Sequence, residues 1–323
     1  GLGARLTGSV TLSRVIMRES VNIDAPAQKR TYAGGVYGEV SGSIITVQNE
    51  SVFEANITIK KMDTNSDIYI YAGGMIGYAG GGFHKFACNG LTVGGTINVT
   101  GENYNNAYVG GLIARVNGTN LSYFEIRSLV FDGLKINAEN ANKICGGLFG
   151  SIWQNVGVYF MSDSDTVENV YKGTKLTVKD ASINAPNASV GGLAYRSSGL
   201  WEIRKKGIDI QKFDIKGKDV GLLVCHGERG TEKVPNSNSN NEEIASLYLK
   251  TTTYWNDQDN YSYKIGNEVS IECPGVFDEF VAYTTKSVDQ ITTNGINGIV
   301  SIATNNQEGV AETEGTCTTY VNR

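Results

Sequence analysis

Five residues in the C-terminal quarter of the chain have the types and spacing of a ligand site. Asp257 and Asp259 stand two positions apart, and Tyr254, Trp255 and Tyr261 surround them. Two carboxylates about 5–10 Å apart can cleave glycosidic bonds, and clustered carboxylates are ligands for Ca²⁺. The stretch therefore predicts a site for a sugar or for calcium, although a solvated turn of the same composition would need neither.

Other residues that could carry chemistry are scattered. Asp163 and Asp165 form a second carboxylate pair, while the two histidines, His84 and His226, are far apart in the sequence. A zinc site made of histidine alone is therefore excluded, and neither HExxH nor CxxC occurs. Cys225 precedes His226 directly, which in a strand places the two side chains on opposite faces. We find no nucleophile, phosphate-binding or dinucleotide motif, so the sequence predicts a protein that is not an enzyme and assigns no catalytic residue and no metal ligand.

Charge and composition narrow the class of protein. The 323 residues include 33 acidic and 28 basic side chains, for a net charge of -5. This balance offers no basic stripe to nucleic acid and no polybasic patch to a membrane, and no apolar run approaches the roughly 18 residues that span a bilayer. Of the five cysteines, Cys273 and Cys317 are the pair considered for a disulfide, and the others are expected to be small buried residues.

The elements that must position any site come from a repeat with a Gly-Gly marker. Its second glycine recurs after steps of 39, 37, 36 and 45 residues, a period typical of stacked repeats. Glycine tolerates φ > 0 and lets neighbouring backbones approach closely, so we assign these residues a structural role. The five pairs are Gly34 and Gly35, Gly73 and Gly74, Gly110 and Gly111, Gly146 and Gly147, and Gly191 and Gly192.

Between the markers, apolar residues come in i, i+2 pairs, such as Phe86 with Cys88 and Leu91 with Val93. Such pairs indicate short strands separated by turns, about three to a repeat. One repeat cannot close a core, but stacked copies can. The sequence therefore predicts an all-β fold, a right-handed parallel β-helix (β-solenoid) of about eight turns with three short strands per turn, about 40 Å long. A β-propeller, with blades of similar length, is the competing fold.

The alternation of side chains predicts which residues face the inside of the coil. The residue after the marker should form one buried column, and a row of small residues two positions further should lie beside it. The position between them should face outward; we expect loops of the same chain to cover it, the alternative being an exposed apolar strip with a binding role. Asp132, Asp180 and Asp209 do not share a register, so no acidic ladder is expected. The three rows are Leu2, Val36, Met75, Leu112, Leu148, Leu193, Leu222 and Ile299; Ala4, Gly38, Gly77, Ala114 and Gly150; and Tyr37, Ile76, Ile113, Phe149 and Leu223.

We interpret residues 1–323 as a single domain. Residues 1–227 hold regular repeats, 228–297 a diverged repeat with an insertion loop, and 298–323 the start of a further repeat. The first residues, Gly1 to Ala4, match the tail of the repeated element, so we expect the chain to be a piece of a longer protein.

The fullest copies of the marker are Gly35-Val36-Tyr37-Gly38, Gly74-Met75-Ile76-Gly77, Gly111-Leu112-Ile113-Ala114 and Gly147-Leu148-Phe149-Gly150. They resemble the GLUG-type repeat, named for Gly-Leu-any-Gly, which occurs in tandem in large secreted bacterial surface proteins and adhesins. The resemblance implies a parallel β-solenoid in an extracellular or cell-surface setting, and it transfers no catalytic residue. We therefore expect a structural or adhesive, non-catalytic segment without a cofactor, calcium aside. Its expected partners are neighbouring repeats of the parent chain and other surface proteins or glycans, with no nucleic acid and no membrane insertion. The alternative is a carbohydrate-active or carbohydrate-binding module with its site near Trp255 and Asp259.

Overall fold

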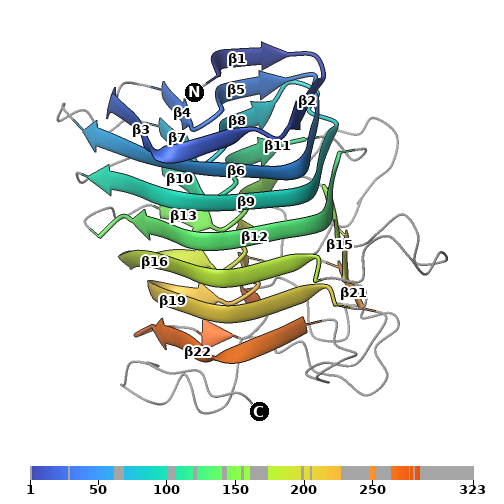
Figure 1. Cartoon of the computed structure of the whole chain (residues 1–323). Coiled ribbons are helices and arrows are strands. Elements are labelled where there is room, and N and C mark those ends of the chain that lie inside the picture. Colours follow the sequence, from blue (N-terminus) through green and yellow to red (C-terminus); the bar gives the residue numbers. More distant parts are fainter. Residues whose placement is uncertain are drawn as a thin grey trace, which may run out of the picture.

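A computed structural model places most of the chain in stacked β-structure (Figure 1). No helix with the length and hydropathy of a membrane span occurs in the part of the chain that it describes. The repeat start predicted at 298–323 and most of the diverged region 228–297 lie outside that part. The described residues are 2–27, 30–61, 69–100, 106–118, 122–139, 144–153, 156–160, 174–197, 200–203, 206–226, 248–251, 263–275, 277–278 and 281–283.

One side of the molecule is an eight-stranded sheet to which each turn contributes one short strand. All neighbours in this sheet pair in parallel. In order across the sheet the strands are β1 (Gly3–Thr7), β5 (Tyr37–Ser41), β8 (Ile76–Gly80), β11 (Ile113–Asn117), β14 (Gly150–Trp153), β17 (Ala194–Arg196), β20 (Val224–His226) and β24 (Val281–Tyr283).

The remaining strands form a second, 16-stranded sheet that bends around the core. Its long strands make up the front of Figure 1 and descend turn by turn from the N-terminus. They are β3 (Ile16–Ala27), β6 (Ile44–Lys61), β9 (Lys85–Thr100), β12 (Tyr123–Asn137), β16 (Leu176–Gly191), β19 (Ile208–Gly221) and β22 (Tyr263–Glu272). The short strands are β2 (Val10–Ser13), β4 (Arg30–Gly34), β7 (Tyr69–Gly73), β10 (Asn106–Gly110), β13 (Ile144–Gly147), β15 (Gly157–Phe160), β18 (Leu200–Ile203), β21 (Tyr248–Thr251) and β23 (Phe277–Asp278).

The chain is thus a parallel β-helix, as the repeat predicts. The propeller is excluded, because propeller blades are antiparallel. The strand lengths differ from the expectation: the apolar pairs from Phe86 to Val99 all lie in one long strand, β9. Bulges bend this strand where turns were expected, for example at Gly90 and Gly95, with φ of 77° and 89°. A bulge redirects a strand without ending its pairing.

The predicted buried column is confirmed along the described turns. Val36, Met75 and Leu112 are fully buried, and backbone hydrogen bonds join them, from Val36 N to Met75 O (2.8 Å) and from Met75 N to Leu112 O (3.0 Å). The column continues through Leu148, Leu193 and Leu222, all fully buried. Leu2, in the first turn, is 57% exposed, and Ile299 lies outside the described residues.

The expectation that the next residue faces outward is wrong. Tyr37 is 9% exposed, and its equivalents Ile76, Ile113, Phe149 and Leu223 are fully buried in the main core. Alternation assumes a straight strand, but the chain bends sharply between the two short strands, so both residues that follow the marker point inward.

The row of small residues lies at the outer side of this bend and not in the coil interior. Ala114 packs against Tyr71 and Tyr108, outside the main core. At Gly38 a Cβ atom would lie 2.8 Å from the carbonyl O of Tyr32. Small residues are therefore required because two strands of the same turn nearly touch at this corner.

Close approach also explains the marker glycines. A Cβ would lie 2.0 Å from the O of Tyr37 at Gly34, 1.8 Å from Ile76 O at Gly73 and 2.2 Å from Ile113 O at Gly110. No real Cβ atom tolerates such contacts. None of these three glycines has φ in the left-handed region, so the predicted structural role is confirmed, while the left-handed conformation offered as one reason for it is not.

Candidate functional site

The residues predicted to bind a sugar or calcium lie outside the described residues. They are Tyr254, Trp255, Asp257, Asp259 and Tyr261, within 252–262. The site there stays a prediction, as does any role of Asp163 or Asp165. The disulfide considered between Cys273 and Cys317 is not present, because Cys273 is in the reduced, thiol form. The described part of the chain contains no group of three or more His, Cys, Asp or Glu that could hold a metal ion.

The clearest described candidate is a row of side chains on the outer face of the eight-stranded sheet. Val40, Ala79, Val116 and Ile152 of this sheet point into the core and are fully buried, so their neighbours point outward. We call these neighbours the outer row. In register from strand to strand they are Arg5, Glu39, Tyr78, Arg115, Ser151, Arg196 and His226.

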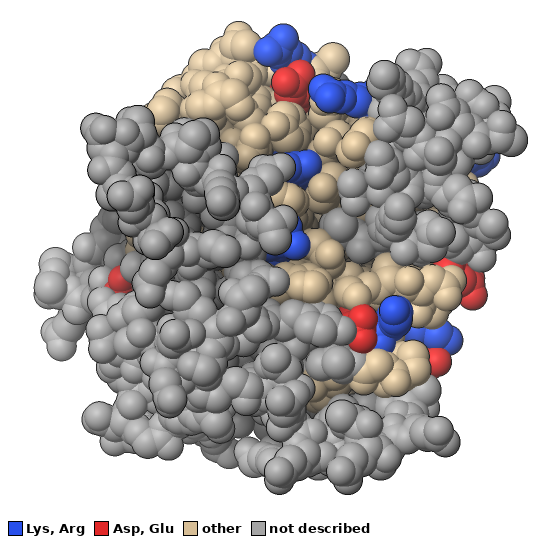
Figure 2. Space-filling model, turned by 180° about the vertical axis from the view of Figure 1, so that it is seen from behind, with Lys and Arg blue, Asp and Glu red and all other residues tan. Residues whose placement is uncertain are grey.

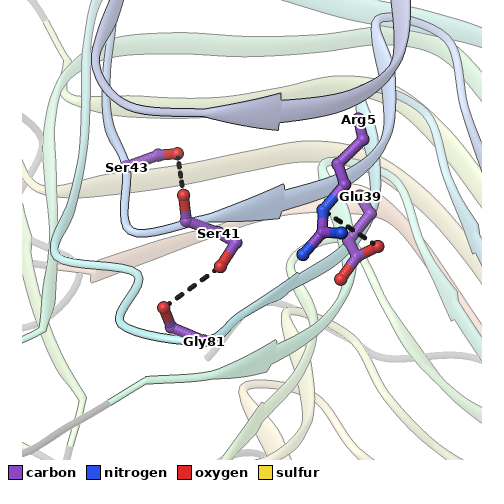
Figure 3. A network of polar contacts seen from close by, with 5 residues as sticks. All are labelled: Arg5, Glu39, Ser41, Ser43 and Gly81. Carbon is purple, nitrogen blue, oxygen red and sulfur yellow. Dashed lines mark hydrogen bonds and ion pairs between the residues drawn. The ribbon is translucent and has the colours of Figure 1, made fainter.

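The first two side chains of the outer row, Arg5 and Glu39, neutralise each other's charge. Arg5 Nε lies 3.6 Å from a carboxylate oxygen of Glu39 (Figure 3). Beside this pair, Ser41 Oγ donates a hydrogen bond to Gly81 O (3.1 Å), and Ser43 Oγ donates one to Ser41 O (2.9 Å). These contacts fasten the edge of the sheet and leave little for a ligand.

Further along the row, two arginines lie against one tryptophan. The Cζ atoms of Arg115 and Arg196 are 4.3 and 4.8 Å from the ring centroid of Trp153. Trp153 Nε1 donates to Ser151 Oγ (2.8 Å), which fixes the indole over the strand between the two arginines. We call Arg115, Trp153 and Arg196 the arginine–tryptophan stack. Each contact is a cation–π interaction, and the pair holds two positive charges at a set separation.

These charges have no acidic partner among the described residues. The ion pairs found there include neither Arg115 nor Arg196. The Nε atoms of both are buried and have no hydrogen-bond acceptor among the described residues, although the Arg115 guanidinium also hydrogen-bonds the Tyr71 side chain. Figure 2 shows basic side chains following one another down the middle of the described surface on the side opposite Figure 1. Within the described part of this acidic protein, the two guanidinium groups thus lie on one face without a carboxylate beside them.

The neighbours of the stack respond to its charge. The pKa of His226 is lowered to about 4, mainly by burial and secondly by the positive charge of Arg196, while the negative charge of Asp219 opposes the shift only in part. His226 is therefore neutral at pH 7. Burial raises the pKa of the Tyr71 phenol, and the Arg115 guanidinium opposes that rise.

A tyrosine cluster adjoins the stack at the corner between the two sheets. The ring of Tyr71 lies 5.0 Å from that of Tyr32 and 5.2 Å from that of Tyr108, both stacked, and 5.3 Å from that of Tyr78. Tyr108 in turn lies 4.7 Å from the Cζ of Arg115. The tyrosine rings and the Arg115 guanidinium therefore form one continuous stack across three turns, in which the rings of Tyr71 and Tyr108 are buried.

A second polar group, on the long strands, is built around Glu125. Its carboxylate accepts from Lys85 Nζ (2.5 Å) and Arg127 Nε (2.6 Å). Burial alone would raise the pKa of Glu125, but these hydrogen bonds outweigh burial and the pKa is lowered. The carboxylate stays ionised, so it acts as an ion-pair anchor and is unsuited to donate a proton.

The expectation that Asp132 and Asp180 occupy different registers is wrong. They are partners across β12 and β16, because a bulge beside Asp132 shifts the pairing. No acidic ladder results: Asp132 binds Lys179 Nζ (2.6 Å), Asp180 binds Lys212 Nζ (3.0 Å), and Asp209 pairs with Thr177. The lysines neutralise the carboxylates turn by turn.

One pattern in the sequence, which the prediction of the site did not use, indicates the stack. Glu39, Tyr78, Arg115, Ser151 and Arg196 each lie four residues after a marker glycine. Reading that position as a row would have placed Arg115 and Arg196 on one face. Cys88, Cys225 and Cys273 are buried, as expected for Cys88 and Cys225. The Sγ of Cys273 donates a hydrogen bond to Lys218 O (3.3 Å).

Comparisons with protein-family models, with curated proteins and with solved structures found no match to this chain.

Proposed function

We propose that this chain is a non-catalytic, structural and adhesive repeat segment of a large extracellular or cell-surface protein of the GLUG-repeat type. Two features together carry the proposal. A buried column runs from Val36 to Leu222, and each turn adds one residue to the outer row. A scaffold of this kind holds its surface side chains about 4.8 Å apart.

Such a surface suits adhesion because successive turns add their side chains to one extended row. Every strand of the eight-stranded sheet between its two edges is paired on both sides, so ligands meet side chains and not free backbone. The partners we propose are neighbouring repeats of the parent chain, together with glycans or other surface proteins that lie along the outer row.

The test joins an adhesion assay with an activity screen. Beads coated with the chain should bind a subset of immobilised glycans or surface proteins, while a screen of polysaccharide lyase and hydrolase substrates should show no turnover. Turnover that disappears in Asp257→Ala and Asp259→Ala would replace this proposal with the carbohydrate-active alternative. No retention on any surface would refute the adhesive part.

A further inference from the structure

In the arginine–tryptophan stack, the Nε atoms of both arginines have no acceptor in the part of the chain that the structure describes. Arg115 and Arg196 are half-buried, and each is held against the indole of Trp153. They lie two strands apart, so their backbones are separated by about 10 Å. Keeping two like charges together without a counter-charge is unfavourable. A ligand with anionic groups would relieve that cost.

We propose that the stack is a binding site for an acidic glycan, a linear polysaccharide bearing carboxylate or sulfate groups. Guanidinium forks bind carboxylate and sulfate oxygens through paired, charge-assisted hydrogen bonds. This proposal specifies the class of ligand for the adhesive function proposed above, and it rests on that function.

The neighbouring residues favour a glycan over other polyanions. Tyr78 precedes Arg115 in the outer row and is half-buried, and its hydroxyl receives a hydrogen bond from Asn117 Nδ2 (3.4 Å). A pyranose ring can lay its apolar face on such a phenol ring while its acidic group reaches the next arginine. From Tyr78 through Arg115 and Trp153 to Arg196, aromatic rings thus alternate with cations along the helix axis, which matches a linear chain of acidic sugars.

Acidic peptides and nucleic acids fit less well. An extended peptide gains most of its affinity by adding a strand to a free sheet edge, and the strands that carry the stack have neighbours on both sides. Nucleic-acid sites neutralise many phosphates at once, whereas the stack offers two cations on a chain whose net charge is -5.

The test uses the full chain and four probes: heparin as the sulfated glycan, polygalacturonate as the carboxylated glycan, neutral dextran, and polyglutamate as an acidic peptide. Binding is measured by biolayer interferometry at two salt concentrations. We expect heparin, polygalacturonate or both to bind, more weakly at high salt. Arg115→Gln and Arg196→Gln should each weaken that binding about tenfold or more.

Matched variants separate the site from general charge effects. Arg18→Gln removes an exposed arginine of β3, which is paired with Glu54, and should leave binding unchanged. Arg115→Lys and Arg196→Lys keep the charge but lose the fork, and should weaken binding by an intermediate factor; they also serve if a glutamine variant does not fold, as judged by its far-UV circular dichroism.

Four outcomes would overturn the assignment: no binding of either acidic glycan, unchanged binding in the folded arginine variants, equal binding of dextran, or tighter binding of polyglutamate. Retention of the wild-type beads on other glycans or proteins would then still support the proposed function, so the two failures are distinguishable.

Discussion

Phe149 is the residue at which alternation and the folded structure disagree most sharply. Alternation places its ring outside the coil, whereas the structure buries it fully. The ring centroid lies 6.2 Å from Phe124, 6.0 Å from Phe131, 6.1 Å from Phe160 and 6.2 Å from Trp201. It therefore stands at the centre of an aromatic group drawn from three turns.

Replacing Phe149 with alanine should be severely destabilising. Phe→Ala in a core costs about 3–5 kcal/mol, from lost burial and from the cavity left behind. Each aromatic pair adds about 0.5–1.5 kcal/mol beyond the buried area. With four surrounding rings we expect the upper part of the range, about 4–5 kcal/mol. An exposed phenylalanine would cost within about 0.5 kcal/mol.

Urea unfolding measures the difference. Far-UV circular dichroism reports the whole β-helix, and tryptophan fluorescence, to which Trp201 contributes, reports the region around Phe149. The control is Ile16→Ala, since Ile16 is a large apolar side chain that is 61% exposed. If Phe149→Ala and Ile16→Ala lower the free energy of unfolding equally, within about 0.5 kcal/mol, then the ring of Phe149 does not point into the core. That result would refute our description of the corner.

Three further predictions concern the backbone and the titrating groups. Gly73→Ala should abolish cooperative urea unfolding, because its Cβ would lie 1.8 Å from Ile76 O; Gly8→Ala, whose Cβ meets nothing within 4 Å, should cost only about 1–2 kcal/mol for its φ of 97°. The pKa of His226 is lowered to about 4 in the folded chain, so its contribution is complete above the unfolded value of about 6.5 and is lost as the pH falls towards 4, on the order of 3 kcal/mol. Urea midpoints between these pH values should show this loss in the wild type and not in His226→Gln; a parallel loss in both would contradict it. Glu125→Gln should cost about 1–3 kcal/mol at pH 7 by removing a carboxylate that two basic groups contact. Because the pKa of Glu125 is lowered, the wild-type advantage should fade as the pH falls below the ordinary carboxyl pKa, and a difference that persisted in acid would argue against the ion pairs.

The repeat determined the architecture from sequence alone. Glycine pairs at steps of 36 to 45 residues, each followed by an apolar residue, are enough to predict stacked parallel turns with Val36, Met75 and Leu112 in one column. The reason is physical: a single repeat cannot bury its own apolar residues, and stacking equivalent positions is the arrangement that buries all of them.

The corner and the candidate site were decided by the tertiary structure. Whether Phe149 points in or out depends on how sharply the chain turns at Gly147. The alternation of side chains along a strand carries no information about that bend. The stack depends on register: Arg115, Trp153 and Arg196 come from three turns, and the last two of the three are separated by the longest step, 45 residues between Gly147 and Gly192. Sequence determines local periodicity, but the extra residues of a long step can be absorbed in loops or bulges, and only the folded chain shows where. That choice places the two arginines against one indole.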